Sequence, residues 1–232
     1  MIARFLSLKR LLAAALIGVS FWGLSLAFPF FIADLSAHPA RAKLEVWGQD
    51  QRLPQPQEIE ALLGRVETAL RWVPGSSAYL ELKGRLYYYR AMAENDRPVH
   101  TRAYLIASKH AYTRASEQRP QWPYNWASIV LIKAHLGELD ATFDEALDRA
   151  LSFGPWEGGV HIALTQAGLM RWSELSERQR VRVGEALSRG MVFNSAILLP
   201  MVEAFAERRQ LCDYANHPLL QRQFSHESLI CD

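Results

Sequence analysis

The sequence lacks an excess of charge of one sign and has few cysteines. Its 26 Lys and Arg residues are balanced by 24 Asp and Glu residues, which leaves a net charge of +2. No broad field favours a nucleic acid, so we expect none as a partner. The only cysteines, Cys212 and Cys231, exclude a dense disulfide framework. In an oxidising compartment they can pair, which would add about 3 kcal/mol of stability; two free thiols are the alternative.

The sequence also lacks the common catalytic and metal-binding motifs. It contains no HExxH, GxSxG, GxGxxG or GxxxxGK[ST] pattern and no Cys/His cluster at metal spacing. We therefore expect no catalysis, no cofactor and no metal. Asp140, Asp144 and Asp148 would share one helix face, where a solvated surface is a simpler interpretation than a cation site.

Strand-length alternation of apolar and polar residues is missing as well, which argues against a sheet. Helical spacing is present instead, because Ile59, Leu62, Leu63 and Val66 fall on one face. The sequence predicts an all-α fold. Its helices are expected from Gln57 to the Pro74-Gly75 stop, after Ser77, and over 99–117, 123–136, 141–152, 159–173, 177–190 and 196–209.

An uncharged run lies near the N-terminus. From Leu11 to Ala33 there are 23 residues without a charge, and about 20 apolar residues suffice for a helix to cross a bilayer. Lys9 and Arg10 precede this run and Asp34 follows it, so the positive-inside rule places the N-terminus in the cytoplasm and the bulk of the chain outside it. A cleaved signal peptide is the alternative, because Ser25-Leu26-Ala27 fits a small-x-small site.

Prolines and an apparent lack of periodicity mark the next segment. Pro39, Pro54 and Pro56 lie among mixed polar residues, which predicts a linker. The expected organisation is a cytoplasmic N-terminus at 1–10, a transmembrane helix at 11–33, a linker at 34–56, a helical-repeat domain at 57–210 and a C-terminal tail at 211–232.

A small-residue pattern recurs along the helical domain. Every second helix ends with an alanine, usually followed five residues later by proline: Ala69 and Pro74, Ala115 and Pro120, Ala150 and Pro155, and Ala186 without the proline. The alanine steps are 46, 35 and 36 residues, and the last two lie near the period of about 34 residues of tetratricopeptide repeats. Trp126 and Gly137 take the places of that repeat's large aromatic and turn glycine. We expect a tetratricopeptide-like domain of about four helix pairs; an irregular bundle is the alternative.

Aromatic side chains gather in two segments between expected helix pairs. Trp122 and Tyr124 lie in the first, and Trp156 and Glu157 in the second. Aromatic rings with polar neighbours bind sugars or anchor protein partners, so these four residues are candidate binding residues. The alternative is that the rings close the junction between stacked repeats. For Trp126 a core position is expected.

The same two segments carry a resemblance to a known family. Residues 119–160 read RPQWPYNWASIVLIKAHLGELDATFDEALDRALSFGPWEGGV and are followed by Gly168, Leu169 and Trp172. This stretch, about a quarter of the chain, resembles the VpsP-type exopolysaccharide-biosynthesis proteins of Gram-negative bacteria. The resemblance implies a role in making or exporting a surface polysaccharide, and it transfers no catalytic residue.

Anchor, helical domain and resemblance together lead to one hypothesis. The chain is expected to be a single-pass protein of the bacterial inner membrane whose periplasmic domain binds polysaccharide polymerase, export or ligase proteins without catalysis. A glycan-binding module that uses the aromatic segments is the alternative, and an enzyme is a third class.

Overall fold

The computed structural model describes residues 2–49, 53–94, 96–206 and 208–215. Within these ranges the fold is all-helical, as the sequence predicts, and no β-strand forms. The elements are α1 (Ile2–Gln49), α2 (Pro56–Trp72), α3 (Ser77–Ala93), α4 (Pro98–Gln118), α5 (Pro123–Leu136), α6 (Ala141–Phe153), α7 (Gly158–Met170), α8 (Glu177–Glu203) and two short 3-10 helices, η1 (Trp172–Glu174) and η2 (Arg208–Asp213).

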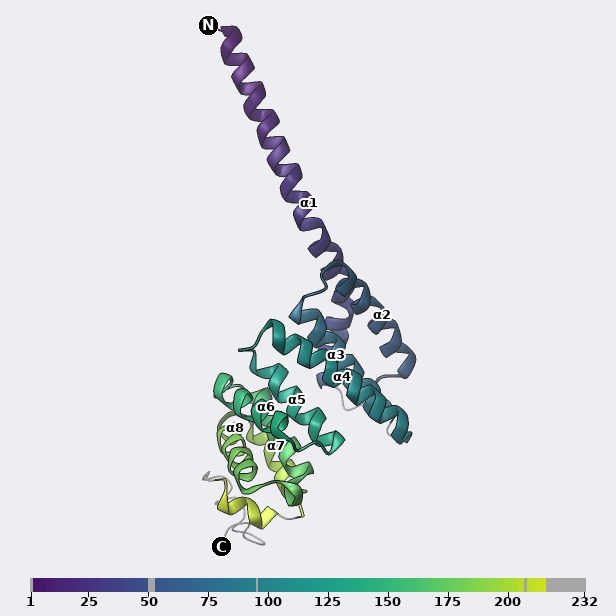
Figure 1. The fold of residues 1–232 in the computed structure, drawn as a ribbon, viewed down its shortest axis with the longest axis vertical. Helices are drawn as coiled ribbons and strands as arrows, with labels where there is room; N and C mark the ends of the chain where they lie inside the picture. Colours follow the sequence, from purple (N-terminus) through teal and green to yellow (C-terminus); the bar gives the residue numbers. More distant parts are fainter. Residues whose placement is uncertain (1, 50–52, 95, 207, 216–232) are drawn as a thin grey trace.

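The helices associate in pairs. The end of α1 packs on α2, α3 on α4, α5 on α6, and α7 on α8. Figure 1 shows these pairs stacked one after another below the long N-terminal helix, with the C-terminal elements at the opposite end. The structure therefore has a helical-repeat arrangement.

The turns between successive pairs share one local geometry. In each, the first residue after the helix donates its backbone N–H to the carbonyl of the repeat alanine: Val73 to Ala69 at 2.9 Å, Arg119 to Ala115 at 3.0 Å and Gly154 to Ala150 at 2.9 Å. These alanines and Ala186 have no exposed surface, so their small side chains let the neighbouring helices approach. The same backbone bond at the same spacing indicates that the turns are equivalent units of the repeat.

The first alanine step is longer because one hairpin is longer. Helices α3 and α4 contain 17 and 21 residues, whereas α5 and α6 contain 14 and 13. Gly137 ends α5 in the left-handed conformation with φ of 73°. A residue with a Cβ is strained there, which explains a glycine in this turn.

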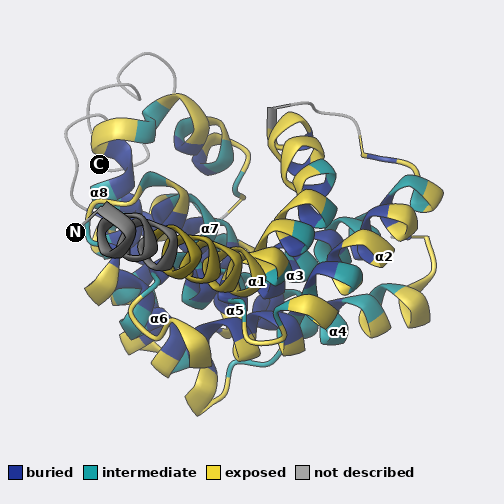
Figure 2. Cartoon of the chain, turned by 90° about the horizontal axis from the view of Figure 1, so that it is seen from above, coloured by how far each residue is buried: buried dark blue, intermediate teal, exposed yellow. Residues whose placement is uncertain are grey.

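Helix α1 is long and apolar enough to cross a membrane. Its apolar side chains between Leu16 and Phe31 are largely exposed; Figure 1 shows this part of the helix extending from the body, and Figure 2 colours it mostly as exposed. Pro29 and Pro39 both lie inside the helix without ending it.

The linker expected at 34–56 is corrected over residues 34–49. These residues continue α1, and its last four turns pack against α2 and α3. Ala33, Ala37, Ala40, Leu44 and Trp47 are all buried there. Their spacing of three and four residues puts them on one helix face, and burial of that face holds the segment helical despite Pro39. The end of α1 is thus the first helix of the first pair, and the repeat domain begins before residue 57.

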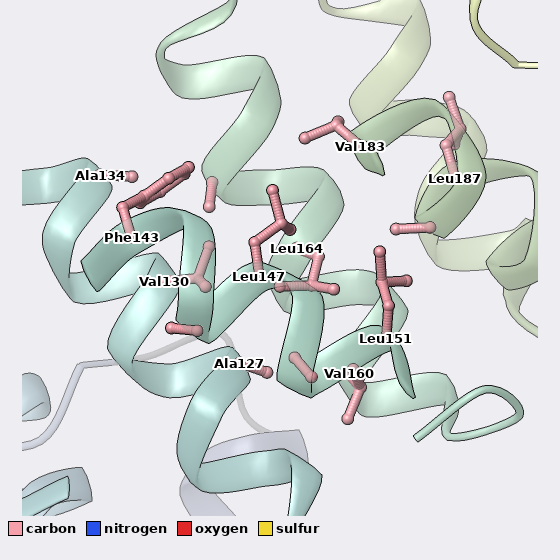
Figure 3. Close-up of a cluster of buried hydrophobic side chains, with 14 of the residues drawn as sticks. Ala127, Val130, Ala134, Phe143, Leu147, Leu151, Val160, Leu164, Val183 and Leu187 are labelled. Carbon is pink, nitrogen blue, oxygen red and sulfur yellow. The ribbon is translucent and has the colours of Figure 1, made fainter. Parts of the chain in front are cut away.

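Within the described residues, two apolar clusters form the core. One joins the end of α1 to α2 and α3, and the other runs from the end of α3 to η2. Figure 3 shows part of the second cluster, where Phe143 and Leu147 of α6 face Val130 of α5 and Leu164 of α7. The core is therefore shared between neighbouring pairs, as stacked repeats require.

Two boundaries near the C-terminus also differ from expectation. The helices expected at 177–190 and 196–209 are the two parts of α8, which a kink at Asn194 separates, but the second part ends at Glu203 rather than at residue 209. Residues 211–215 do not belong to a free tail, because Leu211 and Ala215 are buried in the core. Burial of these two side chains extends the domain past the expected end at 210.

Candidate functional site

The aromatic segments lie beside one another at the start of α5 and α7. Trp122 is the N-cap of α5, and its ring centroid lies 5.3 Å from that of Tyr124. The Tyr124 hydroxyl donates a 2.6 Å hydrogen bond to Glu157, the N-cap of α7. Burial and the carboxylate of Glu157 raise the pKa of Tyr124 to about 12, so the hydroxyl stays a donor. The structure thus brings three of the four candidate binding residues into one row.

The same row continues to the preceding pair. The indole N–H of Trp122 donates to Glu81 of α3 at 3.2 Å, and the Arg119 guanidinium lies 4.2 Å from the ring centroid. Trp122 and Tyr124 are half-buried. With their polar groups already bonded, these two rings hold three successive pairs together.

Trp156 differs from the other three candidates. It is 69% exposed and lies in the turn between α6 and α7, next to Glu157. Among the candidate rings it has the largest surface available to a ligand. Binding by these residues stays a prediction.

Trp126 is half-buried and packs against the main core cluster. Its indole N–H donates a 2.7 Å hydrogen bond to the carbonyl of Pro120, and the Arg149 guanidinium lies 4.6 Å from its centroid. The ring therefore packs against the core, as expected, but is only half-buried, and a cation lies over it.

Trp126 also lines a groove that combines apolar and charged walls. This groove lies between α4 and α6 above α5 and has a volume of about 400 Å³. Its lining residues are Lys109, Thr113, Ser116, Glu117, Pro120, Trp126, Ile129, Lys133, Thr142, Glu145 and Arg149. Charges of both signs around an apolar floor suit a polar peptide segment better than a small apolar molecule.

A buried ammonium fixes one end of this groove. Only 4% of the Lys133 side chain is exposed, and its Nζ lies 3.1 Å from Glu138 and 2.9 Å from Asp140. Glu138 also pairs with Lys109 of α4 at 2.6 Å. Burial opposes ionisation of Glu138, but hydrogen bonds from Lys109 and Lys133 outweigh it and hold its pKa below the ordinary value. The α5–α6 turn is thereby tied to α4.

The groove recurs one pair earlier. There, Glu67, Leu70, Arg71 and Pro74 line a shallow hollow, and residues 46 positions later, Thr113, Ser116, Glu117 and Pro120, line the main groove. A second hollow, which shares Lys83 and Arg114 with the first, matches as well: its residues Ala107, His110 and Arg114 recur 35 positions later as Thr142, Glu145 and Arg149. These offsets equal the alanine steps of the sequence. The second helices therefore form a repeated groove along the stack.

The aspartates expected on a solvated face make specific contacts instead. Asp140 is the N-cap of α6 and accepts from the backbone N–H groups of Thr142 and Phe143. Asp144 accepts from Gln179 at 2.6 Å, and Asp148 pairs with Arg178 and with Arg182 at 2.8 Å from α8. This face of α6 joins α6 to α8, so the prediction of a solvated face is corrected.

Sequence reasoning missed Lys133 and Glu138, which shape the groove. A lysine among apolar neighbours in α5 was the available signal, because a buried cation requires carboxylates nearby. Of the two cysteines, Cys212 lies in η2 and is not a free thiol. Cys231 lies outside the described residues, so its pairing with Cys212 stays a prediction.

No family model, curated protein or solved structure matches the chain.

Proposed function

We propose that the chain is a membrane-anchored, non-catalytic scaffold of bacterial exopolysaccharide biosynthesis or export. Helix α1 crosses the inner membrane once, and the repeat domain lies in the periplasm. There it binds polymerase, export or ligase proteins of the polysaccharide machinery through the groove of the second helices. The resemblance of residues 119–160 to the VpsP-type proteins supports a role in exopolysaccharide biosynthesis or export.

The repeated groove carries the proposal. It follows three successive second helices, α2, α4 and α6, with walls at matching positions. An extended segment of a partner can lie along such a surface and contact several repeats at once. Exposed side chains such as Thr113 and Glu145 on its walls allow contact without unfolding the stack.

Site-specific photocrosslinking in envelope membranes tests this proposal. A photoreactive residue in place of Glu145 is expected to capture a polysaccharide polymerase, export or ligase protein. The same residue in place of Glu174, which is exposed in η1 and outside the groove, is the control and should capture none of them. If Glu145 captures no assembly protein from membranes that retain the full-length chain after carbonate extraction, the scaffold function is wrong.

Glycan binding is the second candidate, and the exposure of Trp156 favours it. A flat ring with 69% of its surface exposed beside a carboxylate is typical of a sugar-stacking residue. Trp156→Ala should weaken binding to an isolated exopolysaccharide at least tenfold while thermal unfolding is unchanged. Trp122→Ala should instead lower stability, because Trp122 is bonded within the stack. An unchanged affinity in Trp156→Ala rules out this site.

A further inference from the structure

The exposed part of α1 contacts the end of α2 at a position N-terminal to the buried stripe of α1. The ring of Phe28 lies edge-on to Trp72 at the end of α2, with centroids 5.9 Å apart. Ala33 is the first fully buried residue of the stripe. The end of α2 therefore reaches one helical turn up α1, into the uncharged run between Leu11 and Ala33.

The position of this contact sets its depth relative to a bilayer. A hydrocarbon core about 30 Å thick takes about 20 helical residues, which from Leu11 ends near Phe30. Phe28 then lies at the outer edge of the hydrocarbon, and Trp72 lies at the same height. Trp72 is still 44% exposed. Tryptophan favours this layer, because its apolar ring and N–H group match the mixed environment of the headgroups.

Positive charge lies beside Trp72. Arg71, Lys83 and Arg114 line a shallow hollow with Pro74 and Glu67 at the end of α2. Glu67 is paired with Lys83 at 3.0 Å. Among the ion pairs of the described residues, neither Arg71 nor Arg114 is matched by a carboxylate. The end of α2 and the adjoining part of α4 therefore offer a tryptophan and two arginines, Arg71 and Arg114, near the contact with α1.

We propose that the end of α2 and the turn at residues 73–76 form a lipid-contact surface that rests on the bilayer. Trp72 inserts among the headgroups next to Phe28, and Arg71 and Arg114 bind anionic headgroups. The repeat stack is thus seated on the membrane at its first pair, while its later pairs extend away. This inference depends on α1 crossing the bilayer. It assigns the first hollow of the repeated groove to lipid, which leaves the groove between α4 and α6 for a protein partner.

Environment-sensitive labelling of the full chain tests the lipid contact. Gly75 is exposed in the turn, and a Cβ there would meet only the Gln118 side chain at 3.7 Å, so Gly75→Cys is tolerated. Val99, which is 80% exposed at the far end of the α3–α4 hairpin, supplies the control label. Each chain is placed singly in nanodiscs of phosphatidylglycerol and phosphatidylcholine, so that no second copy can cover the label.

A bimane at residue 75 is expected to shift its emission to the blue and to lose most of its quenching by aqueous iodide, whereas a bimane at residue 99 keeps both aqueous values. In the label-75 background, Trp72→Ala should reverse the shift and Trp156→Ala should not. The double variant Arg71→Glu with Arg114→Glu should reverse it in anionic discs.

Equal iodide quenching at residues 75 and 99 in discs that retain the full chain would overturn the proposal. A label-75 shift that persists unchanged in Trp72→Ala and in the double variant would overturn it as well. Neither result touches the scaffold function, because the groove residue Glu145 reports that function separately.

Discussion

At the residue scale, Asp140 combines two stabilising roles. It caps α6 through the backbone N–H groups of Thr142 and Phe143, and it pairs with the buried ammonium of Lys133. Because 56% of its side chain is exposed, the ion pair is screened by solvent and contributes less than about 1 kcal/mol. The cap contributes about 1 kcal/mol. The cap is therefore the larger of the two contributions.

Two substitutions at Asp140 separate these roles. Asp140→Asn keeps an acceptor for the cap and removes only the charge, so the free energy of unfolding should fall by less than about 1 kcal/mol. Asp140→Ala removes both and should cost about 1 to 2 kcal/mol. Urea unfolding of the soluble repeat domain measures the difference. Equal losses in the two variants would contradict the cap assignment.

The carboxylates around Lys133 predict a dependence of stability on pH. Hydrogen bonds from Lys109 and Lys133 hold the pKa of Glu138 below its ordinary value. The pKa of Asp140 is lowered as well. The unfolded chain therefore binds more protons near the ordinary carboxyl pKa of about 4, so stability is lost as the pH falls below about 5. Lys133→Met keeps the length of the side chain and removes the cation. Its unfolding free energy should fall less steeply between pH 5 and pH 3 than that of the parent chain.

Two glycines predict opposite effects of one added methyl group. A Cβ on Gly168 of α7 would overlap the side chain of Val183 of α8, whereas a Cβ on Gly64 of α2 would meet nothing. Gly168→Ala should destabilise the domain by about 1 to 3 kcal/mol through overpacking. Gly64→Ala should stabilise it by up to about 1 kcal/mol, because alanine favours an exposed helix. Thermal unfolding of the pair provides an internal control, and destabilisation of both would contradict this packing.

At the element scale, the helices that the sequence predicted well are those that end at a proline or a glycine. Pro74, Pro120 and Pro155 follow the ends of α2, α4 and α6, and Gly137 ends α5; these are local signals. The end of α1 was missed because its stripe consists mainly of alanines, such as Ala33 and Ala37, which carry little hydrophobic signal. The stripe is buried by α2 and α3, which follow it in the chain. A local pattern does not reveal that partner.

The candidate site was predictable only in part for a similar reason. The sequence singled out Trp122, Tyr124 and Glu157 individually, but the bond between Tyr124 and Glu157 joins residues 33 positions apart. The repeat period indicates that Trp122 and Glu157 are equivalent, since both are N-caps. Side-chain directions at those caps depend on how the pairs pack, which the period alone does not specify.

The helical end of α1 predicts where the domain can be truncated. A fragment that starts at residue 33 keeps the first helix of the first pair and should unfold cooperatively as a monomer. A fragment that starts at residue 57 exposes the face of α2 that includes Ile59 and Val66. It should aggregate or lose several kcal/mol of stability, since each large buried side chain contributes about 1.5 to 3 kcal/mol. Size-exclusion chromatography and urea unfolding compare the two, and equal stability would mean that residues 33–49 act as a linker.

At the scale of the whole molecule, one helix joins the apolar segment to the repeat stack without a described break. Inserted residues therefore move the stack as a rigid body, by about 1.5 Å and about 100° each. Insertions after Gly23 leave the contact between Phe28 and Trp72 intact. Seven alanines there raise the stack by about 10 Å with almost no net rotation, whereas two raise it by about 3 Å and rotate it by about 200°.

These insertions predict two separable losses. Seven alanines should abolish the emission shift of the label at residue 75 by lifting the first pair from the headgroups. Two alanines should keep most of that shift but reduce crosslinking from position 145 to a partner fixed in the same membrane. The same emission and crosslinking measurements detect both effects. Retention of both signals in both variants would show that α1 bends between the membrane and the first pair.

The number of residues in α1 thus sets both the height of the repeat stack above the membrane and its rotation about the helix axis. A flexible tether tolerates a gained or lost residue because it fixes neither the height nor the rotation of the domain that it carries. In this chain, a single deletion between Gly23 and Phe28 points every wall of the groove in a new direction over the membrane, although no contact inside the domain changes.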